Sequence, residues 1–230
     1  MGMDEARVSW APPLLEIRGG AEFPVRQAWC VGRNYAEHAR EMGVDPRTSR
    51  PVFFTKPASV LHNAISVPYP SETESLHHEV ELVVMLAAGG RNLPAEQWPE
   101  RIAAYAVGVD LTRRDVQDAL KKAGQPWERA KAFDGSGPVG LAVSADEWTP
   151  QPDRSIALQV NGVVRQQATL GDMIWSVPEL LARLSAEFTL HAGDVIFTGT
   201  PAGVGAVAEG DRIVASIDGL PPLEFRITPA

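Results

Sequence analysis

Short apolar runs, separated by proline and glycine, recur along the chain and predict more strands than helices. The strongest run lies at 79–86, and a second run at 104–110 ends in an aspartate. Asn161-Gly162 lies between two further runs and is typical of a two-residue turn that joins antiparallel strands. The other strands are expected at 27–31, 52–55, 138–143, 156–160, 163–168, 195–198, 212–217 and 223–227.

Three helices are expected, and each should begin at a polar capping residue that is followed three positions later by an acidic residue. The pairs are Asn34 with Glu37, Thr112 with Asp115, and Ser176 with Glu179, which predict helices at 35–42, 112–122 and 176–187. Strands outnumber helices and do not alternate regularly with them. The pattern therefore favours a β-rich α+β fold over a doubly wound one.

Composition narrows the classes of protein. The 230 residues are 44% hydrophobic, which is enough for a buried core. The net charge of −8 argues against a nucleic-acid partner, but it is compatible with a local basic pocket. The single cysteine, Cys30, excludes an intrachain disulfide and is expected to be a buried small residue. No signal peptide is evident, and the longest apolar stretch, 82–88, is too short to cross a membrane. We therefore expect a cytoplasmic protein with no membrane partner.

Two glutamates in the strongest strand are candidates for chemistry. Side chains alternate faces along a strand, so Glu79 and Glu81 should point the same way, while Val80 and Leu82 point into a core. A pair of solvated surface acids would have the same spacing. Asp110, at the end of the next strand, could be a capping residue or a third ligand. Three hard oxygen ligands would suit Mg²⁺, Mn²⁺ or Ca²⁺ rather than Zn²⁺.

Six motifs resemble those of the fumarylacetoacetate hydrolase family, in particular its single-domain acylpyruvase and oxaloacetate decarboxylase branch. Any one of them alone would be weak, but the six occur in the order found in the family, and the resemblance extends from about residue 29 to residue 217. They are Cys-Val-Gly-Arg-Asn-Tyr at 30–35, Phe-Thr-Lys-Pro at 54–57, His-His-Glu-Val-Glu-Leu at 77–82, Gly-Val-Asp-Leu-Thr-Arg-Arg-Asp at 108–115, Ala-Lys-Ala-Phe-Asp at 130–134 and Phe-Thr-Gly-Thr-Pro-Ala-Gly-Val-Gly at 197–205.

The resemblance implies a mixed β-roll, as in the C-terminal domain of the family, usually in a homodimer. Residues 1–28 would be a lead-in and residues 29–230 the catalytic domain. The cofactor would be Mg²⁺ or Mn²⁺. The implied metal ligands are Glu79, Glu81 and Asp110; the implied catalytic residues are His38, Glu41 and Lys131; the implied substrate-binding residues are Arg33, Asn34, Lys56, Gln117 and Thr200.

Each of these residues also has a structural interpretation. His38 and Glu41 would share a helix face, as an exposed polar pair or as a general base with the residue that orients it. Lys131 could reach solvent or bind an oxyanion. The glycine-rich stretch at 198–205 lacks the pattern of a phosphate-binding loop and could be a plain turn. His77 and His78 are expected to support the glutamates without binding metal.

The implied activity is hydrolysis of a C–C bond in acylpyruvates, which are 2,4-diketo acids such as fumarylpyruvate, through a metal-bound pyruvate enolate. Oxaloacetate decarboxylation, or isomerisation of related intermediates, is the alternative within the family. A non-catalytic metal- or ligand-binding protein is the alternative from another class. Ser136-Gly137-Pro138-Val139-Gly140 departs from the cysteine and serine often found around these glycines in the family, a difference that bears on the substrate and not on the metal site.

Overall fold

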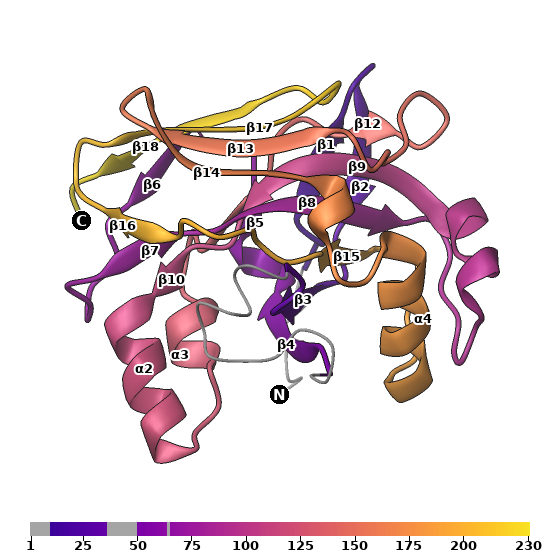
Figure 1. Cartoon of the computed structure of the whole chain (residues 1–230), viewed down its shortest axis with the longest axis horizontal. Coiled ribbons are helices and arrows are strands. Elements are labelled where there is room, and N and C mark those ends of the chain that lie inside the picture. Colours follow the sequence, from indigo (N-terminus) through magenta and orange to yellow (C-terminus); the bar gives the residue numbers. More distant parts are fainter. Residues whose placement is uncertain (1–9, 36–49, 64) are drawn as a thin grey trace, which may run out of the picture.

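The computed structural model describes residues 10–35, 50–63 and 65–230. Two sheets form its centre, and Figure 1 shows strands β13, β14 and β17 of one sheet lying over β8 and β9 of the other. The larger sheet has the order β12-β9-β8-β15-β3-β4, with strands at Val143–Ser144, Ile102–Val109, Val80–Leu86, Asp194–Phe197, Gln27–Gly32 and Val52–Pro57. The second has the order β14-β13-β17-β18-β6, with strands at Val163–Thr169, Ser155–Val160, Arg212–Ile217, Leu223–Thr228 and Ser66–Pro68.

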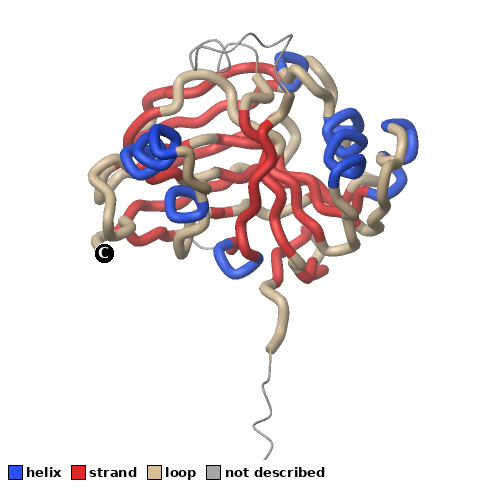
Figure 2. Tube along the Cα trace, turned by 90° about the horizontal axis from the view of Figure 1, so that it is seen from below, coloured by secondary structure: helices blue, strands red, loops and turns tan. Residues whose placement is uncertain are grey.

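Three small sheets, three α-helices and four short 3₁₀ helices complete the described part of the chain, and Figure 2 shows the strands through the middle of the molecule with the helices outside them. The 3₁₀ helices are Ala58–Val60, Ala95–Gln97, Pro99–Arg101 and Leu170–Asp172. The small sheets are β1-β2 (Leu14–Ile17, Ala21–Pro24), β10-β7-β16 (Thr112–Arg113, Leu76–His78, Gly205–Val207) and β11-β5 (Gly137–Pro138, Leu61–His62). The helices are α2 (Arg114–Ala123), α3 (Glu128–Lys131) and α4 (Val177–Glu187). The β-rich α+β fold expected from the sequence is confirmed.

Strand β8 is buried along its whole length because both of its faces are covered. Val80 and Leu82 pack in the core between the two large sheets. Val83 and Met85 point the other way, into a second core cluster that also contains residues from β1 and β2. The carboxylate of Glu81, on the same face as Val83, is therefore held inside the protein and not on a solvated edge.

Most of the expected strands are present, and so is the hairpin. Asn161 and Gly162 have positive φ values of 53° and 79°, as a two-residue turn between paired antiparallel strands requires. The helix expected at 176–187 begins with a capping box, in which Glu179 accepts hydrogen bonds from the backbone N–H and hydroxyl of Ser176 at 2.8 and 2.7 Å.

Three expectations were wrong in detail. The strand at 138–143 is two short strands, β11 and β12, because Pro138 has no N–H for a ladder and Gly140 bonds instead to the carbonyl of Val107. Helix α2 begins at Arg114, since Thr112 and Arg113 are used in pairing β10 with β7. The strand expected at 52–55 continues through Lys56 to Pro57. The helix expected at 35–42 falls outside the described residues.

Gly108 on β9 should tolerate no side chain. A Cβ there would lie 2.5 Å from Val83 Cγ2 and 2.9 Å from a ring carbon of Phe197. Gly108→Ala is therefore expected to lower the free energy of unfolding, measured by urea denaturation, by about 1–3 kcal/mol. Gly32→Ala is the control, because its Cβ would meet its nearest neighbour at 3.5 Å. Equal stability of the two variants would contradict this prediction.

Candidate active site

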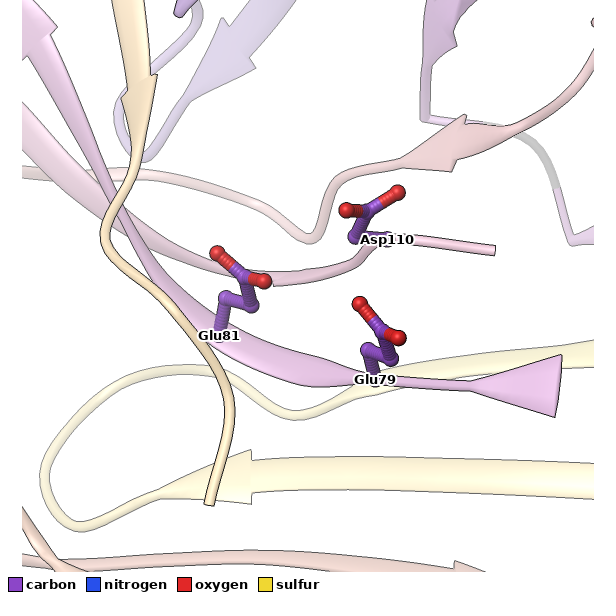
Figure 3. Close-up of side chains that lie close together, drawn as sticks. All are labelled: Glu79, Glu81 and Asp110. Carbon is purple, nitrogen blue, oxygen red and sulfur yellow. The ribbon is translucent and has the colours of Figure 1, made fainter. Parts of the chain in front are cut away.

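Three carboxylates converge at one end of the β8–β9 pair. Glu79 lies in the break between β7 and β8, Glu81 lies two residues further on, and Asp110 follows the last residue of β9. The backbone N–H of Asp110 donates to the carbonyl of Glu79 at 2.8 Å, which places the two residues opposite each other. One oxygen from each carboxylate lies within 4.8 Å of the others, and all three side chains are buried (Figure 3).

Basic side chains neutralise two of these carboxylates. Lys131 Nζ lies 2.7 Å from both Glu79 Oε2 and Asp110 Oδ2, and Lys56 Nζ lies 2.9 Å from Asp110 Oδ1. The Arg114 guanidinium forms an ion pair with the other oxygen of Glu79. Burial alone would lower the pKa of the Lys131 ammonium, but Asp110 and Glu79 outweigh it and raise that pKa, so Lys131 stays charged.

Glu81 differs from its two neighbours. Among the described residues no basic side chain lies within 4.0 Å of it, and its Oε2 accepts a hydrogen bond from the backbone N–H of Gly199 at 2.6 Å. Burial, followed by the charges of Asp110 and Glu79, raises the pKa of this carboxyl well above its usual range. A buried carboxylate without a cation, beside two others, is the donor set that Mg²⁺ or Mn²⁺ prefers. The residues therefore fit the divalent cation expected from the sequence.

The raised pKa of Glu81 has a consequence for the metal-free protein. In the unfolded chain this carboxyl titrates near 4.5, so above that pH the folded protein binds more protons than the unfolded chain. The part of the stability that depends on Glu81 should therefore decrease as the pH rises from about 4.5 through the raised pKa. The measurement is the difference in free energy of unfolding between Glu81→Gln and the parent protein, in EDTA, as a function of pH.

We expect this difference to favour Glu81→Gln increasingly as the pH rises. Glu209→Gln, at an exposed position, is the control and should follow the parent protein at every pH. A difference that does not change with pH would contradict the prediction.

A pocket opens onto the three carboxylates, and its other walls are basic, polar and aromatic. Such a lining suits a small anion that also has a flat or apolar part. Apart from the carboxylates, the pocket is lined by Val31, Gly32, Arg33, Phe54, Arg114, Gln117, Lys121, Trp127, Lys131 and Thr200.

Three of the five expected substrate-binding residues line this pocket. They are Arg33, whose backbone has a positive φ of 66°, Gln117 on α2, and Thr200. Lys56 does not line the pocket, but it touches the site through Asp110.

Asn34 is placed differently from these residues. Its amide donates to the carbonyls of Trp175 and Thr198 at 3.1 and 2.8 Å and accepts from the backbone N–H of Trp175 at 2.9 Å. This side chain joins two loops, and both of its N–H groups are occupied, so it has no donor left for a substrate. His38 and Glu41 lie outside the described residues.

Several residues at the site were not selected from the sequence, and two of them with polar contacts to selected residues are Arg114 and Gln166. Arg114 stands in the motif at 108–115, directly before an aspartate, and only the folded chain shows that it reaches Glu79. Gln166 is the one buried residue between exposed neighbours on β14, and its amide contacts Thr200. The strand pattern at 163–168 could have indicated an inward position there, but not its partner.

The remaining candidates have the structural places expected for them. His78 Nδ1 lies 2.9 Å from Gln166 Oε1, and His77 accepts from Arg114 Nε at 3.4 Å. Burial lowers the pKa of both imidazoles, that of His77 to about 4, so both are neutral near pH 7. Cys30 is fully buried, and burial raises the pKa of its thiol, which argues against a nucleophile.

Fold and site together define a β-rich domain with a buried acidic cluster beneath a basic pocket, and comparison with known proteins identifies its class. Residues 27–228 match the family model described as the fumarylacetoacetate (FAA) hydrolase C-terminal domain. The chain belongs to the fumarylacetoacetate hydrolase family, as its motifs indicated, and is an enzyme of that family with the family's fold.

Similar proteins include oxaloacetate tautomerases and a fumarylpyruvate hydrolase. The chain is 46% identical to oxaloacetate tautomerase YcgM of Escherichia coli over 92% of this chain and 94% of that protein, and 43% identical to the mitochondrial oxaloacetate tautomerase FAHD1 of rat over 86% and 90%. The solved structure of fumarylpyruvate hydrolase from Pseudomonas aeruginosa, in complex with Mn²⁺ and pyruvate, is 44% identical. It superposes with a TM-score of 0.95 over 99% of this chain and 100% of that one. No helix among the described residues is long and apolar enough to span a membrane.

Proposed function

We propose that this protein is a Mg²⁺- or Mn²⁺-dependent hydrolase that cleaves a C–C bond in acylpyruvates, with fumarylpyruvate or a similar 2,4-diketo acid as substrate. The observation that carries the proposal is the convergence of three buried carboxylates, one of them without a basic partner among the described residues, at the base of a basic pocket. The similar Pseudomonas aeruginosa enzyme, whose structure holds Mn²⁺ and pyruvate, supports the same assignment.

In this proposal Glu79, Glu81 and Asp110 hold the metal ion. The bound ion would supply a Lewis acid to the keto oxygen of the substrate. Lys131 and Arg114 place positive charge beside the same carboxylates. These two side chains would bind the carboxylate of the substrate and stabilise the oxyanion that forms as the C–C bond breaks.

Hydrolysis also needs a base, and we propose His38 for this role, with Glu41 to orient it. The imidazole would take a proton from the water that attacks the distal C4 carbonyl. Breaking the C3–C4 bond then gives a carboxylic acid and pyruvate. A spacing of three residues would place both on one face of the helix expected at 35–42.

Oxaloacetate tautomerisation or decarboxylation is the second candidate, and the relatives named as oxaloacetate tautomerases favour it. Tautomerisation moves a proton between C3 and the keto oxygen, while decarboxylation releases CO₂ from the same position. Neither reaction needs an attacking water. Both would use the same carboxylates and Lys131, so they differ from hydrolysis only in the role of His38.

A panel of substrates tests these functions. Acylpyruvates, fumarylpyruvate and oxaloacetate are each assayed with Mg²⁺, with Mn²⁺ and with EDTA, and pyruvate release, CO₂ release and enol–keto conversion are followed separately. We expect metal-dependent release of pyruvate from fumarylpyruvate. Turnover of oxaloacetate alone would favour the second candidate. If no substrate is turned over in a metal-dependent way, the protein would instead be a non-catalytic metal- or ligand-binding protein with this fold.

We also propose a homodimer, from the family alone. Light scattering should give about two chain masses across a wide range of protein concentrations. A single chain mass throughout that range would contradict the dimer and leave the proposed chemistry unaffected.

A further inference from the structure

The side-chain amide of Gln166 joins the strand that carries the glutamates to the loop that carries Thr200. Gln166 is fully buried on β14, between exposed neighbours. Its Oε1 accepts a hydrogen bond from the backbone N–H of Val80, between the two glutamates, at 3.1 Å. Its Nε2 donates to the carbonyl of Pro201 at 2.9 Å and to Thr200 Oγ1 at 2.7 Å.

Two backbone partners fix the orientation of this amide. The N–H of Val80 can only donate, and the carbonyl of Pro201 can only accept, so the oxygen of Gln166 must face Val80 and its nitrogen must face Pro201. The bond to Thr200 therefore has one direction: Gln166 donates and the threonine hydroxyl accepts.

This direction determines what Thr200 can offer to a substrate. A hydroxyl has a single proton, and here one of its lone pairs is already occupied by Gln166. Among the described residues, none accepts the Thr200 proton, and Thr200 lines the pocket together with Glu81 and Lys131. The hydroxyl is left to donate into the pocket, toward an oxygen that carries negative charge.

The loop that carries Thr200 is also held by contacts at residues on either side of it, Gly199 and Gly203. The N–H of Gly199 donates to Glu81 Oε2 at 2.6 Å. Gly203 lies so close to β14 that a Cβ on it would be 2.2 Å from the carbonyl of Arg165. With Gln166 between these two contacts, the hydroxyl has a fixed place relative to the three carboxylates. A donor that is held in place before the substrate arrives needs no reorganisation on binding.

We propose that Gln166 is a positioning residue that keeps the Thr200 hydroxyl as a donor to a carboxylate or keto oxygen of the substrate. This inference rests on the proposed function, since it takes a 2-keto acid as the ligand. Gln166 acts through Thr200 and does not itself touch the substrate. Removing either residue should therefore weaken the same interaction.

A double-mutant cycle in the full chain tests the proposal, with pyruvate as the probe in the presence of Mn²⁺ and its Kd measured by calorimetry. Thr200→Val and Gln166→Met should each raise the Kd by about tenfold or more, as expected for loss of a hydrogen bond to a charged group. In the Thr200→Val background, Gln166→Met should add almost nothing. Thr200→Ser, which keeps the hydroxyl, should restore most of the affinity.

Controls separate this role from a purely structural one. Gln167→Met changes the exposed neighbour on the same strand and should leave the Kd unchanged. If Gln166→Met does not fold, Gln166→Glu carries the test, because it keeps the size and the acceptor for Val80 but has no N–H for Thr200. The Thr200 variants remain as an independent arm.

Several outcomes would overturn the proposal. A Thr200→Val protein that binds pyruvate as tightly as the parent, or effects of Gln166 and Thr200 that simply add, would exclude the coupling while leaving the proposed function intact. A parent protein that neither binds pyruvate with Mn²⁺ nor turns over any keto acid would remove the proposed function and this inference together.

Discussion

Glu81→Gln is expected to reduce metal-dependent turnover by about 10³-fold or more, because the loss of a ligand removes several kcal/mol of Lewis-acid stabilisation. The metal-free variant should be at least as stable as the parent protein near pH 7. Glu81 is buried, its pKa is raised by burial and by Asp110 and Glu79, and it has no basic partner among the described residues. A neutral amide of the same size removes that repulsion.

Turnover with added Mn²⁺, together with melting temperatures with and without Mn²⁺, checks this prediction. The parent protein should melt at a higher temperature when Mn²⁺ is added, since a metal that binds only the folded state stabilises it, and Glu81→Gln should not respond. Glu209→Gln controls for loss of a surface charge. An active Glu81→Gln enzyme that Mn²⁺ still stabilises would remove Glu81 from the metal site.

The second large effect is expected at His38 and separates hydrolysis from decarboxylation. His38→Ala should slow hydrolysis of fumarylpyruvate by about 10²–10⁴-fold, the usual cost of losing a general base. Oxaloacetate decarboxylation should fall much less, because it needs no activated water. Glu41→Ala should have the same pattern with smaller losses, since its proposed role is to orient His38.

Both reactions are measured at saturating Mg²⁺. Substrate affinities are measured beside the rates, because a helix at 35–42 that closed over the site, as the family resemblance implies, would also order the substrate. His191→Ala, at an exposed position before β15, is the matched control. Equal losses in the two reactions would mean that His38 serves closure or substrate binding, and the assignment as base would be wrong.

Local sequence pattern was enough to predict much of the fold. The apolar run at 79–86, the turn at 161–162 and the capping box at Ser176 each depend on neighbours in the chain, and each appears where it was expected. The start of α2 could not be found in this way. Thr112 is a good capping residue, but its backbone pairs with β7 as part of β10. This pairing is a contact between distant segments of the chain.

The same distinction between local pattern and tertiary contact applies to the residues of the candidate site. The spacing of Glu79 and Glu81 indicated a pair of carboxylates on one strand face, and the family motifs added Asp110 and Lys131. The pairing of Arg114 with Glu79, and the contacts that occupy both N–H groups of Asn34, depend on tertiary distances that no motif encodes. Whether a polar residue faces the pocket or holds two loops together was therefore open until the fold was known.

Strand β15 sets the point during synthesis at which the larger sheet can be completed. It lies between β8 and β3 in the larger sheet and joins the antiparallel β3–β4 pair, made early, to the β8–β9 pair. Closing such a long loop is slow, and here it must wait until residue 197 has left the ribosome. Until then a nascent or truncated chain should expose the unpaired edge of β8, a template for aggregation.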